Sequence, residues 1–120
     1  MQNRDYEVVK PGFIFNTNPD FPHAPPDWDR DQAIEVARNL ALEMSEGHWE
    51  IVRALQEFYA SHERIRVREL LDALDERFHF KGGARYLLQM FPGGPLNQGC
   101  QIAGLTAPLG NVDKAYGTVR

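Results

Sequence analysis

Residues 45–59 read SEGHWEIVRALQEFY, and this stretch decides the fold. Ser45 is a good N-cap residue, and Glu46 follows in the first turn, where a negative charge favours the helix dipole. Apolar side chains then recur at helical spacing, which predicts one buried stripe along a helix. The stripe consists of Trp49, Val52, Leu55, Phe58 and Tyr59. We therefore expect this helix to contribute a large share of a helical core.

A second helix is predicted over residues 67–78, after a break in the pattern at Ser61–Glu63. Its inward side chains are expected to be Val67, Leu70, Leu71, Leu74 and Phe78. The connection between the two helices is short, which also permits a helix-turn-helix-like interpretation.

Two shorter helices complete the predicted core after a linker at Lys81–Gly83. One covers residues 84–90 and is stopped by the sequence FPGG. Pro95 can open the other as its first residue. This last helix is expected to end near Gly104 and to carry Leu96, Cys100 and Ala103 along one side.

The part before residue 45 predicts a hairpin, a loop and one more helix. Tyr6–Phe15 has two β-prone runs around Pro11–Gly12, a pair suited to a type II turn. Residues 16–26 predict a surface loop that Phe21 and Trp28 pin to the core. A helix then starts near Asp29 or Asp31, either of which can cap it. Its inward stripe is predicted to be Ile34, Ala37, Leu40 and Ala41.

The sequence thus predicts one mainly α domain of about five helices over residues 1–120. Residues 1–28 form the hairpin and loop, residues 29–104 the helical core, and residues 105–120 a flexible C-terminal arm. The formal charge of −4 argues against broad nucleic-acid binding, which needs a basic surface. The N-terminus lacks the apolar core of a signal peptide, and no apolar run approaches a membrane span. These features predict a cytoplasmic protein that does not bind membranes.

Cys100 is the one cysteine of the chain. A single cysteine excludes an intrachain disulfide and a thiolate-rich zinc site. The four histidines lack ligand-like spacing, and no nucleotide-binding fingerprint occurs, so we predict no metal and no cofactor. Two interpretations of Cys100 stay open. It is either a reactive thiol, which needs solvent access, or a small apolar residue packed on the last helix.

The basic residues gather between Arg64 and Arg85. Arg64, Arg66 and Arg68 either form a solvated turn with salt bridges to neighbouring acids or a basic patch that binds a partner or nucleic acid. Lys81 and Arg85 are further candidates for partner binding. Either of them could also stabilise a Cys100 thiolate if it lay close.

A set of short motifs resembles a known family when taken together and in order. The motifs are Ser45-x-x-His48-Trp49-Glu50, Phe58-Tyr59, Arg68-x-Leu70, Arg85-Tyr86-Leu87, Phe91-Pro92-x-Gly94-Pro95 and Cys100-x-Ile102-Ala103-Gly104-Leu105. They look like the DsrC/TusE/DsvC family of sulfur-relay proteins, which includes the so-called gamma subunit of dissimilatory sulfite reductase. The match extends over about residues 28–108.

The resemblance implies packed helices with an N-terminal hairpin, a helix-turn-helix-like element and a flexible arm. It also implies that sulfur is carried on arm cysteines as a persulfide and exchanged with partner enzymes. Sulfurtransferases and dissimilatory sulfite reductase-type proteins are the implied partners. Family members are carriers and not stand-alone catalysts.

The sequence departs from the family pattern at the end of the arm. The family has a second cysteine near the chain end, at the position of Asn111, and normally stops soon after it. Here the chain continues nine residues beyond Asn111, to Arg120. Asparagine cannot carry sulfur or join a disulfide, so Cys100 is left as the one candidate sulfur-binding residue.

Two functions therefore remain as predictions. The first is a sulfur carrier that works through Cys100 alone. The second is a regulatory or adaptor protein that has lost the carrier function and binds protein, or less favourably DNA, through the helix-turn-helix-like element. A third, weaker alternative is a structural subunit that docks through the face of the first helix.

Overall fold

The computed structural model describes residues 19–108, and within them the chain forms five α-helices. The helices are α2 at Arg30–Asn39, α3 at Glu46–Ser61, α4 at Val67–Arg77, α5 at Ala84–Met90 and α6 at Pro95–Ala103, with a short 3-10 helix, η1, at His79–Lys81. No strand occurs between residues 19 and 108. The predicted hairpin at Tyr6–Phe15 lies outside the described residues.

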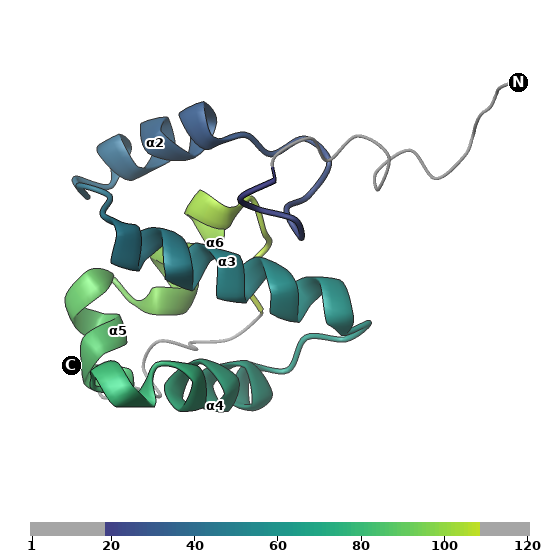
Figure 1. Ribbon diagram of the computed structural model, residues 1–120, viewed down its shortest axis with the longest axis vertical. Helices are drawn as coiled ribbons and strands as arrows, with labels where there is room; N and C mark the ends of the chain where they lie inside the picture. The colour runs from purple at the N-terminus through teal and green to yellow at the C-terminus, as the bar shows by residue number, and fades with distance from the viewer. Residues whose placement is uncertain (1–18, 109–120) are drawn as a thin grey trace, which may run out of the picture.

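Helix α3 crosses the middle of the molecule, as Figure 1 shows. It packs mainly on α6, and α2 covers α6 from another side. Helix α4 runs along the opposite side of α3, and α5 connects α4 to α6. The stripe predicted for residues 45–59 is confirmed for Trp49, Val52 and Leu55, which are buried, whereas Phe58 and Tyr59 are half-buried.

Side chains fix the starts of the helices much as the sequence predicts. The Asp29 carboxylate accepts the Gln32 backbone N–H at 2.7 Å and caps α2. Ser45 is the N-cap of α3. Pro95 is the first residue of α6, where its missing N–H leaves no helical hydrogen bond unmade.

Helix α2 ends two residues before the predicted inward position Ala41, and that prediction is wrong. The chain reverses there, because the Leu42 N–H donates to the Ala37 carbonyl at 2.8 Å. Ala41 takes the left-handed conformation that this reversal needs, with a φ of 61°, and its side chain is exposed. Ala33 is buried on the inner face of α2 together with Ala37.

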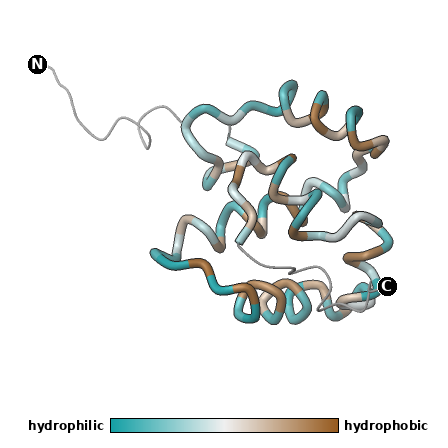
Figure 2. Tube along the Cα trace, turned by 180° about the vertical axis from the view of Figure 1, so that it is seen from behind, coloured by the Kyte–Doolittle hydropathy of each residue, from teal (hydrophilic) through white to brown (hydrophobic). Residues whose placement is uncertain are grey.

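Helix α4 has one apolar face, visible as alternating colours along its tube in Figure 2. Leu70, Leu71 and Leu74 are buried on that face, and Phe78 is buried directly after the helix. The predicted residues of this helix are thus confirmed, except that Val67 is half-buried. None of the helices within residues 19–108 combines the length and apolarity needed to cross a bilayer.

The loop before α2 is attached to the core through Phe21, as predicted. Phe21 is fully buried, and its ring lies 4.7 Å from the ring of Trp28 and 5.6 Å from the ring of Trp49. The Arg53 guanidinium lies over the Phe21 ring, 4.6 Å from the ring centre. The loop therefore holds Trp28 in place against the end of α6.

Candidate functional site

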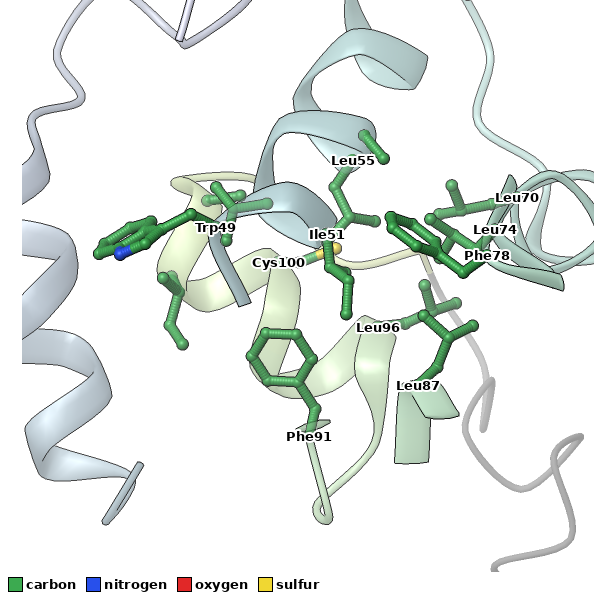
Figure 3. Close-up of a cluster of buried hydrophobic side chains, with 14 of the residues drawn as sticks. Trp49, Ile51, Leu55, Leu70, Leu74, Phe78, Leu87, Phe91, Leu96 and Cys100 are labelled. Carbon is green, nitrogen blue, oxygen red and sulfur yellow. The ribbon is translucent and has the colours of Figure 1, made fainter. Parts of the chain in front are cut away.

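Cys100 lies on α6 with none of its surface exposed. Figure 3 shows its sulfur among the buried hydrophobic side chains of the core, below α3. Leu96 and Ala103, which the sequence predicts on the same side of this helix, are buried as well. In this conformation Cys100 therefore occupies the packed position that the sequence left as one of two alternatives.

The chain turns back on itself directly after Cys100. The Leu105 N–H donates to the Cys100 carbonyl at 2.9 Å, and the Gly104 N–H donates to the Gln101 carbonyl at 3.4 Å. This pair of bonds is the Schellman ending of a helix, which needs a left-handed residue. Gly104 supplies it with a φ of 78°. The reversal directs residues 105–108 back along the side of the core that contains Cys100.

Two side chains, the half-buried Trp28 and the buried Gln56, fix the last turn of α6. The Trp28 indole N–H donates to the Ile102 carbonyl at 2.8 Å. The Gln56 side-chain amide donates to the Ala103 carbonyl at 3.0 Å. Both carbonyls belong to the helix end, where no helical N–H remains to satisfy them. Cys100 is thereby held in a rigid frame formed by α3 and the loop before α2.

Tyr59 of α3 joins Cys100 to the segment that follows it. Its hydroxyl donates to the Thr106 carbonyl at 2.7 Å, and the same oxygen lies 3.8 Å from the Cys100 sulfur. A hydroxyl has one hydrogen, and the Thr106 carbonyl can only accept. The hydroxyl hydrogen points at the Thr106 carbonyl, so the contact of the Tyr59 oxygen with the Cys100 sulfur is the weaker of the two.

Residues 105–108, at the start of the predicted flexible arm, lie against the core. Leu105 and Ala107 pack against its buried side chains, and Thr106 between them is exposed apart from its bond to Tyr59. We call residues 105–108 the strap. The rest of the predicted arm, residues 109–120, lies outside the described residues.

Gln56 shows a second unusual feature on the same face of α3, one turn before Tyr59. Only 1% of its surface is exposed, and its side-chain oxygen has no hydrogen-bond partner among residues 19–108. Leaving a buried acceptor unpaired costs about 1–3 kcal/mol. Such groups are uncommon in native structures and occur at functional positions.

The structure does not bring Lys81 to Cys100. The Lys81 ammonium donates to Glu50 at 3.0 Å, and this hydrogen bond raises the lysine pKa. Glu50 lies nine residues before Tyr59 on α3, about 13 Å away along the helix axis. Arg85 is exposed on α5. A positive charge next to the thiol, which the sequence left open, is therefore not provided by Lys81.

Three further candidates lie at the N-terminal end of α4, and all of them are exposed: Arg64, Arg66 and Arg68. The ion pairs within residues 19–108 involve other basic residues: Arg38, Arg53, Arg77 and Lys81. In the part of the chain that the structure describes, no ion pair joins Arg64, Arg66 or Arg68 to Glu63 or Glu69, the partners that one of the two alternatives expects. The eleven residues of α4 separate this group from Lys81 and Arg85 by about 16 Å. The five predicted binding residues therefore form two groups.

Tyr59, which contacts Cys100, and Gln56, which binds the end of α6, are not among the site residues that the sequence predicts. Tyr59 was assigned to the core, and Gln56 was not singled out. A signal was present, because both have polar tips on the inward face of a helix that is otherwise apolar, and such tips require partners. Their partners lie 41–47 residues further along the chain, which a helical pattern does not reveal.

Tyr59 should make the protein sensitive to alkaline pH. Burial raises the pKa of Tyr59 above its ordinary value of 10.0, and the neighbouring Cys100 adds to the rise. The folded protein then holds the phenolic proton more tightly than the unfolded chain. The resulting stabilisation is complete below pH 10 and is lost as the pH rises further.

We therefore expect urea midpoints of the wild type to fall more steeply than those of Tyr59→Phe between about pH 10 and pH 12. Lysines and the other tyrosines titrate in both proteins, so the difference isolates Tyr59. Parallel curves for the two proteins would contradict the expectation.

The fold and the site define a small helical protein with one cysteine, which is buried on the last helix next to a short strap. Residues 1–112 match the family model described as DsrC like protein. The chain belongs to this family. The match ends one residue after Asn111, so the last eight residues lie beyond the family pattern.

Proteins named sulfurtransferase TusE are similar to this chain. The Salmonella typhimurium protein is 39% identical over 84 residues, which are 68% of this chain and 77% of the relative. The Photorhabdus laumondii protein is 30% identical over 110 residues, 90% of this chain and 92% of the relative. The Escherichia coli protein is 37% identical over 84 residues, with 68% and 77% covered. No solved structure matches. These relatives favour the sulfur-relay interpretation over the regulatory alternative.

Proposed function

We propose that this chain is a cytoplasmic sulfur-relay protein that accepts sulfur on Cys100 and passes it to a partner protein. The observation that carries the proposal is the position of the one cysteine of the chain within a DsrC-like sequence and fold. Any thiol chemistry of this protein must use Cys100. Because Asn111 replaces the second cysteine of the family pattern, the sulfur is held as a persulfide and not as an internal disulfide.

The proposed step is a transfer of sulfane sulfur between thiols. The Cys100 thiol loses its proton to a base in solution or on the partner. The thiolate attacks the outer sulfur of a donor persulfide, R–S–SH. A new sulfur–sulfur bond forms, the bond within the donor breaks, and R–S⁻ leaves, which gives Cys100–S–SH. An acceptor thiolate removes the sulfur by the same reaction, so no external oxidant or reductant is needed.

The burial of Cys100 fits a carrier that reacts only when opened. No donor can reach a fully buried sulfur in the conformation described here. The strap is short, and its contacts to Tyr59 and the core can break without unfolding the helices. The proposed partners are a sulfurtransferase as donor and a sulfurtransferase or sulfite reductase-type protein as acceptor, whose binding would coincide with opening.

The test is sulfur uptake followed by intact mass spectrometry. The full chain is incubated with polysulfide, or with thiosulfate and a sulfurtransferase, and then desalted without reductant. We expect the wild type to gain the mass of one sulfur atom, and dithiothreitol to remove it. Cys100→Ser should gain nothing, and neither should Cys100→Ala, which keeps an apolar side chain in the core.

Two results would overturn the proposal. One is a wild type that gains no sulfur from either donor. The other is a Cys100→Ala variant that gains as much as the wild type, since sulfur would then be held elsewhere. Circular dichroism of each variant checks that the helices are retained, so that a loss of uptake is assigned to the thiol.

A further inference from the structure

The strap lies next to Cys100, where a small set of contacts of different kinds holds it. The Leu105 side chain packs on the core, and its N–H is bonded to the Cys100 carbonyl. The Thr106 carbonyl is bonded to Tyr59 at 2.7 Å, the shortest of these bonds. Thr106 is otherwise exposed, so its side chain does little to hold the segment. Among these contacts, the hydroxyl of Tyr59 is the one that a single-atom change removes.

Tyr59 also touches the sulfur that the strap covers. Its oxygen lies 3.8 Å from the Cys100 sulfur, so one atom contacts both the cover and the covered group. Movement of the strap away from Tyr59 breaks the bond to Thr106 and releases the hydroxyl hydrogen. The hydroxyl can then turn toward the sulfur, which it cannot do while the carbonyl holds it.

We propose that Tyr59 is a latch that keeps the strap closed over Cys100 and thereby sets how often the thiol is exposed. This inference deepens the proposed function, on which its biological meaning rests, by naming the residue that regulates access to the carrier thiol. The closed latch protects the thiol, or a sulfur stored on it, from chance reactants. A partner that breaks the hydrogen bond between Tyr59 and the Thr106 carbonyl opens the latch.

The positions of Tyr59 and of the strap allow the strap to move while Tyr59 stays in place. Tyr59 is anchored on α3, the central helix, whose neighbouring side chain Gln56 is bonded to the end of α6. The hydroxyl therefore stays in place when the strap leaves. The strap is joined to α6 through Gly104, which lacks a Cβ atom and can therefore leave its φ of 78° at little steric cost, so it can serve as a hinge. Opening can then occur at the hinge with α6 intact.

The experiment measures exposure of Cys100 with iodoacetamide in the native full-length protein. Tyr59→Phe removes the hydroxyl and keeps the ring. Loss of one hydrogen bond of ordinary strength should raise the open fraction, and with it the alkylation rate, about five-fold. Leu105→Ala, which weakens the strap from its other side, should also raise the rate. Tyr86→Phe is the matched control, because the Tyr86 hydroxyl faces Gly47, and its rate should equal that of the wild type.

Hydrogen exchange distinguishes a latch from a general loss of stability. The Leu105 amide, which is bonded to Cys100, should exchange faster in Tyr59→Phe by about the same factor as the alkylation. The Val52 amide, in the buried middle of α3, should exchange as in the wild type. An unchanged alkylation rate in Tyr59→Phe overturns the latch. Equal acceleration at Leu105 and Val52 does so too, because exposure would then follow global unfolding.

The latch and the proposed function can fail separately. If the wild type takes up sulfur and Tyr59→Phe is alkylated no faster, the latch is wrong and the carrier stands. If Tyr59→Phe is alkylated faster but no variant takes up sulfur, the latch stands and the carrier is wrong.

Discussion

His48→Ala should lower the free energy of unfolding by about 3 kcal/mol, the larger share of which comes from two lost hydrogen bonds. His48 is buried near the start of α3. Its Nδ1 accepts the Ser45 backbone N–H at 3.0 Å, and its Nε2 lies 2.8 Å from the Met90 carbonyl. The substitution leaves both of these backbone groups without their partner.

The hydrogen positions on the ring follow from its partners. An N–H group can only donate, so Nδ1 is the acceptor, and the Met90 carbonyl can only accept, so Nε2 carries the hydrogen. The ring thus bonds to one backbone group through each of its two nitrogens. It also meets the Phe91 ring edge-on, with centroids 5.2 Å apart. One side chain thus joins the start of α3 to the end of α5 and to the core.

Equilibrium urea unfolding of the wild type and the variants provides the measurement. His48→Gln is the informative comparison, since glutamine at this position of a capping box can still bond to the Ser45 N–H. It should recover about 1 kcal/mol, because it keeps the cap and loses the bond to Met90. His62→Ala, at an exposed histidine, should change stability by no more than about 0.5 kcal/mol. A His48→Ala value as small as that would show that the bridge to Met90 contributes nothing.

The sequence predicted the local elements of this fold well because local signals determine them. Residues 84–90 form a helix with the predicted ends, where glycines precede it and Phe91–Gly94 follows it. Ser45, Asp29 and Pro95 act at helix starts by chemistry that involves their near neighbours. Each of these assignments requires knowledge of only a few adjacent residues.

The arrangement around Cys100 could not be predicted in the same way. The sequence predicts Cys100 on one side of the last helix, together with Leu96 and Ala103, and leaves its exposure open. Its burial depends on Tyr59, which meets it across 41 residues, and on a strap that returns over it after Gly104. These contacts arise from packing of α3 on α6. A helical pattern shows which side chains face inward, but it does not show which of them meet.

Gly99 is the residue that permits this packing, and Gly99→Val should lower the free energy of unfolding by about 3 kcal/mol. Gly99 is buried on α6 next to Cys100. A Cβ atom at this position would lie 2.8 Å from a methyl carbon of Leu55, closer than two carbon atoms can approach. Because Leu55 is itself fully buried, it has little room to move aside. Valine adds two further methyl groups, so α6 must move away from α3.

Urea unfolding again measures the effect, and the exposed residue Gln101 gives the matched control on the same helix. Gln101→Val introduces the same β-branched residue without crowding α3, so it reports helix propensity and the loss of the exposed hydrogen bonds from Gln101 to Asn97, together about 0.5 kcal/mol. A similar loss at the two positions would mean that the close approach of the helices is not what Gly99 provides.

A double variant identifies the contact itself. Leu55→Ala alone should cost about 3 kcal/mol through the cavity that it leaves. In that background the valine at position 99 can fill part of the cavity, so the two losses should combine to at least 1 kcal/mol less than their sum. If the losses of unfolding free energy of the two single variants simply add in the double variant, the strain of Gly99→Val does not arise from contact with Leu55. Because the same packing covers Cys100, the single variant should also speed alkylation of the thiol, whereas the Gln101 control should not.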